Sequence, residues 1–117
     1  LANEADFDPW YTIPALADDD YIRQLARLTR QRLEPGRKVY LEYSNEMWNW
    51  GFLQAQFGAR RGMDLDKPFY LRDNATDTRF TGTGYHTLNT WTAKKSHDIF
   101  CIFLEEGFTN DEIVTTL

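Results

Sequence analysis

The chain has 117 residues, enough for one domain at most. Its net charge of −5 argues against a nucleic-acid backbone as a partner. No apolar run approaches the about 18 residues of a membrane span, and no signal peptide is visible. A single cysteine, Cys101, excludes an internal disulfide and a cysteine metal cluster. It lies in the apolar run IFCIF, where we expect a buried, inert thiol.

Aromatic residues make up 15% of the chain, including four tryptophans. This content suits sugar binding, in which indoles stack on the apolar faces of pyranose rings, although aromatic rings also fill cores.

The first part of the chain predicts a strand followed by a helix. Residues 1–7 read as the end of a helix or a loop, and Trp10–Ile13 as a short strand stopped by Pro14, with Trp10 near the core. The run Asp18-Asp19-Asp20 could hold a metal, but carboxylates are also favoured at an N-cap and in the first helical turn, and we expect that role.

A helix is predicted over residues 19–33, ended by Glu34-Pro35-Gly36. One apolar face carries Ile22, Leu25, Ala26, Thr29 and Leu33. Another face carries Arg23, Arg27 and Arg30. These arginines could bind phosphate, but we expect a solvated face partly paired with Asp19 or Asp20.

The stretch from Val39 to Trp50, VYLEYSNEMWNW, is the most informative one. Over residues 38–44, Val39, Leu41 and Tyr43 alternate with Tyr40, Glu42 and Ser44, as in a strand. The β-α-β order predicts that this strand is parallel to Trp10–Ile13 with a right-handed crossover. The strand runs directly into Ser44-Asn45-Glu46 and the indoles of Trp48 and Trp50.

Two further helices and a strand are predicted. Asn49 is the expected N-cap of a helix that ends near Gly62, followed by a long polar loop, Met63–Thr83. A second long helix covers Gly84–Glu106 and stops at Gly107. Its buried face is expected to comprise Tyr85, Leu88, Trp91, Thr92, Ile99, Ile102 and Phe103. Its histidines, His86 and His97, are eleven residues apart, too far to share one metal. Glu112–Leu117 reads as the beginning of a strand.

Asn45-Glu46 at the end of a strand resembles the Asn-Glu pair of the retaining glycoside hydrolases that are built on the (β/α)8 barrel. In that clan the pair closes the fourth strand. The patterns YLEYSNEMWNWGF and PWYTIPALADDDY are together similar to a bacterial group within the clan, sometimes labelled cellulose-binding. The likeness covers residues 8–58 and, more loosely, 80–108.

The resemblance implies an α/β fold, a partial (β/α)8 barrel. Residues 1–117 would form a single incomplete fragment, from the third strand to the start of the fifth. A complete barrel needs about 250 residues, so we expect a piece of a longer protein, in agreement with the absence of an initiator Met at Leu1. The location would be extracellular or periplasmic if the parent acts on polysaccharide.

The resemblance also implies the site. Glu46 would be the general acid/base, and Asn45 would hydrogen-bond the sugar 2-hydroxyl. Trp48, Trp50 and Trp10 would stack on sugar, and His86 would lie near the mouth of the barrel. A polysaccharide or oligosaccharide is the expected partner, with no cofactor and no metal.

A retaining mechanism needs a second carboxylate about 5–5.5 Å away, and an inverting one about 6.5–9.5 Å. Glu42 is four strand residues before Glu46, about 13 Å, so we expect it to pair with a cation or hydroxyl instead. The clan's nucleophile closes the seventh strand, which has no counterpart in this chain. We therefore expect no glycosidase activity from the chain alone, and self-association through exposed sheet edges.

Two alternatives remain. The chain could belong to a non-catalytic carbohydrate-binding protein of the same fold. It could instead be a small α/β interaction domain in which Ser44-Asn45-Glu46 caps a helix.

Overall fold

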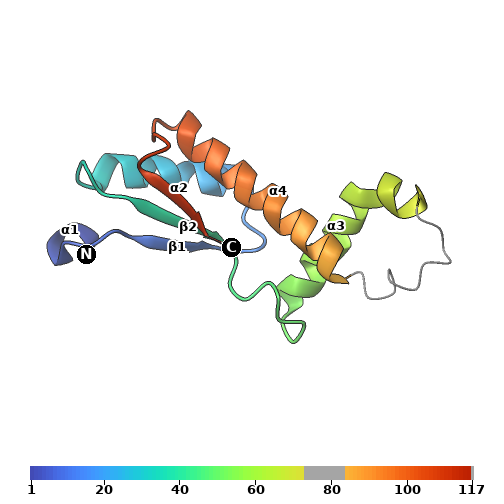
Figure 1. Ribbon diagram of the computed structural model, residues 1–117. Coiled ribbons are helices and arrows are strands. Elements are labelled where there is room, and N and C mark those ends of the chain that lie inside the picture. Colours follow the sequence, from blue (N-terminus) through green and yellow to red (C-terminus); the bar gives the residue numbers. More distant parts are fainter. Residues whose placement is uncertain (73–83, 117) are drawn as a thin grey trace. The chain divides into compact units, whose positions relative to one another are not determined.

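The computed structural model describes residues 1–72 and 84–116, with side chains for 1–65 and 85–116. The described chain is mixed α/β, with four helices and a three-stranded parallel sheet (Figure 1). In chain order the elements are α1 (Ala2–Ala5), β1 (Trp10–Ile13), α2 (Asp19–Arg32), β2 (Val39–Tyr43), α3 (Leu53–Arg72), α4 (Gly84–Glu105) and β3 (Ile113–Thr116).

These elements form two compact units. The first, which we call the sheet unit, comprises Leu1–Asn45 and Lys95–Leu117. The second, the helical unit, comprises Glu46–Lys94. Each unit is described by itself below.

The sheet has the strand order β1-β2-β3, with all strands parallel. Trp10 lies opposite Tyr40, and Val39 lies opposite Ile113. Side chains of alternating strand residues point to opposite faces, so the buried residues Val39, Leu41 and Tyr43 share one face. α2 and the second half of α4 cover a single face of the sheet (Figure 1). The predicted parallel pairing of the first two strands is confirmed.

Helix α2 begins and ends where the sequence predicts. The Asp18 carboxylate is the N-cap and accepts a hydrogen bond from the Tyr21 amide at 2.8 Å. Asp19 and Asp20 occupy the first turn, at the positive end of the helix dipole. The three aspartates therefore serve the helix start, and no group of three metal-ligating side chains occurs in the part of the chain that the structure describes.

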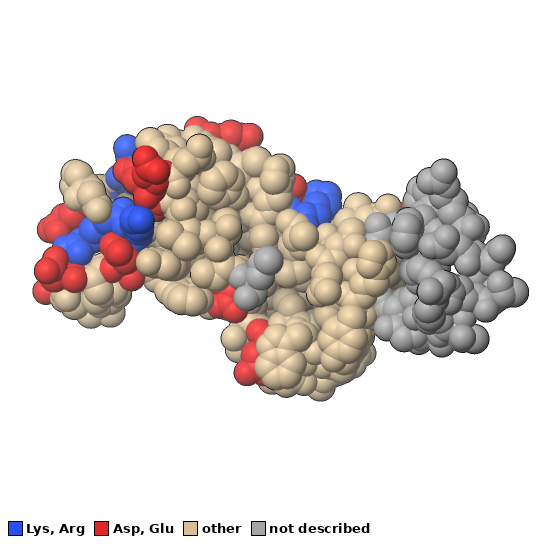
Figure 2. Space-filling view, in the orientation of Figure 1, with Lys and Arg blue, Asp and Glu red and all other residues tan. Residues whose placement is uncertain are grey.

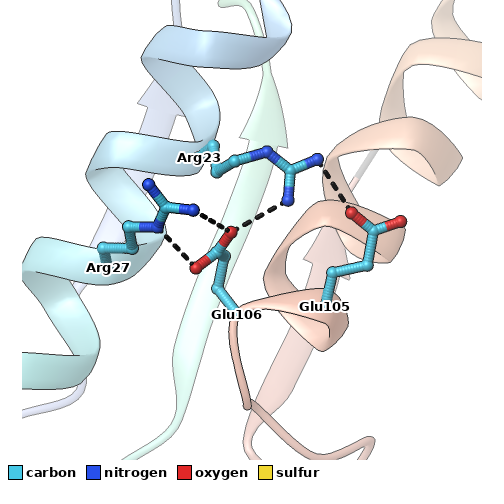
Figure 3. A network of polar contacts seen from close by, with 4 residues as sticks. All are labelled: Arg23, Arg27, Glu105 and Glu106. Atoms are coloured by element: carbon cyan, nitrogen blue, oxygen red, sulfur yellow. Dashed lines mark hydrogen bonds and ion pairs between the residues drawn. The ribbon is translucent and has the colours of Figure 1, made fainter.

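The arginines of α2 have different partners from those predicted. Figure 3 shows Arg23 and Arg27 reaching from α2 to Glu105 and Glu106 at the end of α4. Arg23 binds both carboxylates at 2.8 Å, and Arg27 binds Glu106 at 2.7 Å. The predicted pairing with Asp19 or Asp20 is wrong, because residues at the far end of α4 lie closer to these guanidinium groups.

Helix α3 departs from the sequence prediction at both ends. It begins at Leu53, so Asn49 is not its N-cap, and it continues to Arg72 rather than ending near Gly62. Gly62 lies inside the helix, and the backbone of α4 approaches it so closely that a Cβ atom there would overlap the Thr87 carbonyl. The remainder of the predicted loop, residues 73–83, lies outside the described residues.

Helix α4 has the predicted bounds within one residue, and Gly107 follows it with φ 94°. Leu88, Ile99 and Phe103 are buried as predicted, whereas Tyr85 is exposed. The expectation of a buried thiol is wrong, because Cys101 is half-buried with its Sγ 3.7 Å from Nε2 of His97. The strand predicted at Glu112–Leu117 is confirmed as β3 over its described residues.

The charged side chains of the sheet unit are mixed in sign. In Figure 2, blue and red atoms alternate around the end of this unit that carries α1, where Arg37 pairs with Asp6 and Glu34. Among the described residues, no helix is long and apolar enough to cross a membrane.

Candidate functional site

The segment that follows β2 turns sharply instead of continuing as a strand or a helix. Ser44 is buried with φ 57°, and Glu46 is half-buried with φ 51°. Side chains other than glycine rarely adopt positive φ, and such residues cluster at functional sites. Asn45 and Glu46 therefore lie just past the carboxyl end of a parallel strand, as the sequence predicts.

Asn49 fixes the position of the Glu46 side chain. Its Nδ2 donates to Oε2 of Glu46 at 3.2 Å, and its backbone amide donates to the Glu46 carbonyl at 2.9 Å. Its Oδ1 accepts from the Gly51 amide at 3.0 Å. Within the described residues, no cation forms an ion pair with Glu46. The carboxylate is thus held by an amide at one oxygen, and its other oxygen has no hydrogen-bond partner among the described residues.

Two tryptophans, Trp48 and Trp50, follow Glu46 closely in the sequence, and Tyr85 of α4 contacts the turn that carries them. Trp50 packs edge-to-face on Tyr85, with ring centroids 5.2 Å apart. The Tyr85 hydroxyl donates to the Trp48 carbonyl at 3.3 Å, so α4 anchors the turn. The Trp48 side chain is 65% exposed. An exposed indole on an anchored turn is a ready stacking surface for an apolar ring face.

Tyr85 is the residue of this cluster that the sequence did not identify. Its helical spacing on α4 matches that of Leu88 and Trp91, which are buried, and for this reason it was assigned to the core. The following residue, His86, is exposed on the same turn of the helix. Tyr85 differs from the buried residues of α4 because it lies against the turn that carries Trp48 and Trp50. A single sequence does not show which helix residue will contact that turn.

Trp10 lies away from the residues that follow β2. It is paired in register with Tyr40, five residues before Asn45, which corresponds to about 16 Å along the strand. The expectation that it lies near the core is also wrong: the side chain is 57% exposed and stacks on Tyr40 at 5.6 Å. The structure therefore does not bring Trp10 and Asn45 together.

The unit boundary falls between Asn45, which is exposed, and Glu46. Trp10 and Asn45 thus belong to the sheet unit, and the other predicted site residues, Glu46, Trp48, Trp50 and His86, belong to the helical unit. We therefore describe the candidate site as the turn from Glu46 to Gly51 with Tyr85, and call it the aromatic turn.

Comparison with known proteins gave no match: no family model, no curated protein and no solved structure is similar to this chain.

Chemically, the aromatic turn combines a held carboxylate, an amide and exposed rings. Rings bind the apolar faces of a ligand, while a carboxylate and amides bind its hydroxyl groups. A ligand with both kinds of surface fits this combination.

Proposed function

We propose that the aromatic turn binds a carbohydrate, and that the chain is part of a (β/α)8 glycoside hydrolase-like protein in which Glu46 is the general acid/base. The observation that carries the proposal is the Glu46 carboxylate, hydrogen-bonded by Asn49 just past a parallel strand, in the same turn as Trp48 and Trp50. In barrel enzymes the chemistry lies at the carboxyl ends of the strands.

In this proposal Trp48 stacks on a sugar ring, and the free oxygen of Glu46 faces the glycosidic oxygen. Retention of configuration needs a nucleophilic carboxylate about 5–5.5 Å from the acid/base. Glu42 does not serve, because its Oε2 already accepts from the Trp10 indole at 3.0 Å and from the Thr12 hydroxyl at 3.3 Å. The nucleophile would come from a residue outside this chain, so the chain alone binds sugar without cleaving it.

The test is a titration with soluble β-glucan and manno-oligosaccharides, followed by tryptophan fluorescence and by amide chemical shifts. Binding should perturb residues 46–51, and Trp48→Ala should weaken it about tenfold or more, the loss of one stacked ring. Trp10→Ala is the matched control, because Trp10 is also largely exposed but lies about 16 Å along the strand from Asn45. No response to any glycan contradicts the proposal.

A non-catalytic carbohydrate-binding protein is the second candidate. The exposed indole of Trp48 supports it, because stacking on a sugar ring needs neither an acid nor a nucleophile. The two candidates differ in the parent protein: the enzyme requires a later strand that ends in Glu, and its Glu46→Gln variant should lose turnover while retaining sugar binding.

A further inference from the structure

We propose that His97 and Cys101 form a binding site for a thiophilic divalent cation, such as Zn²⁺, on the outer side of α4. This inference does not depend on the carbohydrate proposal. The two residues are four positions apart on the helix, so their side chains lie on one face, one turn apart. The Cys101 Sγ lies 3.7 Å from Nε2 and 3.8 Å from Nδ1 of His97. A sulfur and an imidazole are thus already in contact.

The separation of the two side chains matches that of two ligands of one metal ion. A Zn–S bond of about 2.3 Å and a Zn–N bond of about 2.0–2.1 Å, joined at a tetrahedral angle, set the sulfur and nitrogen about 3.6 Å apart. A cation can therefore bind without separating the side chains, once the exposed imidazole rotates to aim one nitrogen at it. Thiolate and imidazole are both zinc ligands, and two histidines at this same helical spacing bind zinc in metalloproteases.

This side of α4 is open to solvent. His97 is exposed and Cys101 is half-buried. The buried residue Ile99 lies two positions from each of them, about 200° around the helix, so the pair lies on the side away from the sheet. In a (β/α)8 barrel the helices form the outer ring, which leaves this outer side accessible. The site is therefore open both in the chain alone and in the barrel that we propose for its parent.

Two of the four coordination positions would be left for water. Glu105 lies one turn beyond Cys101, but its carboxylate accepts from Arg23 at 2.8 Å. Within the described residues, no group of three side chains could hold a metal. Two protein ligands bind less tightly than the four of a structural zinc site, so the cation should exchange with solution. The thiol proton passes to solvent when the cation binds, and binding should therefore weaken as the pH falls.

A bound cation would join two successive turns of α4 and stabilise the folded chain, because the unfolded chain does not hold the two ligands together. No metal was expected from the sequence, since its two histidines are eleven residues apart and its single cysteine was expected to be buried. The partial exposure of Cys101 and its contact with His97 remove both reasons.

Titration with Cd²⁺ tests the proposal, with the thiol kept reduced by a non-thiol reductant. A thiolate-to-cadmium charge-transfer band should appear in the difference absorption spectrum and saturate at one cation per chain, and Zn²⁺ should displace the Cd²⁺. Cys101→Ser should abolish the band. His97→Gln should weaken binding about tenfold or more, because the second ligand of a chelating pair binds intramolecularly. His86→Gln is the matched control, since it removes the other histidine of the chain and should leave the affinity unchanged.

Thermal melting gives a second readout. At about a hundred times its dissociation constant, Zn²⁺ should raise the melting temperature of the wild-type chain by several degrees and leave that of Cys101→Ser unchanged. Circular dichroism without metal checks that each variant is folded. Four results would overturn the proposal: no charge-transfer band at millimolar Cd²⁺, equal affinities of wild type and His97→Gln, a complex of two chains per cation, or an equal rise in melting temperature for Cys101→Ser.

Discussion

The indole Nε1 of Trp10 donates to Oε2 of Glu42 at 3.0 Å, which ties β1 to β2 on the sheet face opposite the helices. The Thr12 hydroxyl donates to the same oxygen at 3.3 Å. Strand parity places Trp10, Thr12, Tyr40 and Glu42 together on this face. The pairing of Glu42 with a hydroxyl group is as the sequence predicts, whereas the indole donor was not foreseen.

The Trp10–Glu42 contact should contribute to the free energy of unfolding as a coupled pair. Trp10→Phe removes the donor, and Glu42→Gln removes the charge of the acceptor. In a double-mutant cycle by urea denaturation we expect a coupling of about 0.5–1 kcal/mol, at the low end because the indole is largely exposed. Additive effects of the two substitutions would show that the charge of Glu42 does not strengthen this hydrogen bond.

Two glycines of α3 should respond differently to alanine. A Cβ on Gly62 would overlap the backbone carbonyl of Thr87, which cannot move without shifting α4. A Cβ on Gly58 would meet the ends of the Met47 and Leu88 side chains, which can rotate away. We expect Gly62→Ala to lower the free energy of unfolding by about 1–3 kcal/mol or more.

Gly58→Ala should be within about 1 kcal/mol of wild type, because improved helix propensity offsets the crowding. Thermal and urea denaturation of both variants measure the difference. Equal effects of the two substitutions would contradict the close backbone approach at Gly62.

Local patterns in the sequence were sufficient for most of the fold. The alternation of Val39, Leu41 and Tyr43 identified a strand, and the aspartates before Tyr21 identified a helix start, because both signals depend on neighbouring residues. The bounds of α3 were not predictable in this way. A glycine near the end of a helical pattern often marks the helix end, and the packing of Gly62 against the backbone of α4 involves Thr87, which is distant in sequence.

The same distinction applies to the candidate site. The sequence predicted that Asn45 and Glu46 follow the strand end directly, since chain order alone determines this. It did not reveal that Asn49 holds Glu46, or that Tyr85 packs on Trp50. Helical periodicity cannot separate a residue at the exposed start of α4 from buried residues one turn later.

The Glu106 network should make stability depend on pH. Hydrogen bonds from Arg27 and then from Arg23 hold the pKa of Glu106 below its ordinary value of 4.5. A carboxyl whose pKa is lower in the folded chain favours folding above its unfolded pKa, and this contribution is lost as the pH falls through the folded pKa. The melting temperature of the wild-type chain should therefore fall on acidification from about pH 5 to about pH 3.

Glu106→Gln should reduce the slope of that decrease, because the substituted side chain does not titrate. Glu105→Gln is the matched control: Glu105 is more exposed and accepts from Arg23 alone, so this variant should retain most of the wild-type slope. If Glu106→Gln leaves the dependence of melting temperature on pH unchanged, other carboxylates are responsible for the loss of stability in acid.

Asn49 should control sugar affinity by holding Glu46 and the turn in place. Its side chain donates to Glu46 and accepts from Gly51, so Asn49→Ala releases both the carboxylate and the turn that carries Trp48. If the aromatic turn is the sugar site, loss of this order should weaken binding about tenfold, because the free turn must be ordered when the ligand binds. Gln56→Ala is the control, since Gln56 makes only a long hydrogen bond of 3.5 Å to the Trp50 carbonyl. Fluorescence titration of both variants measures the effect, and equal affinities would show that Asn49 does not organise the site.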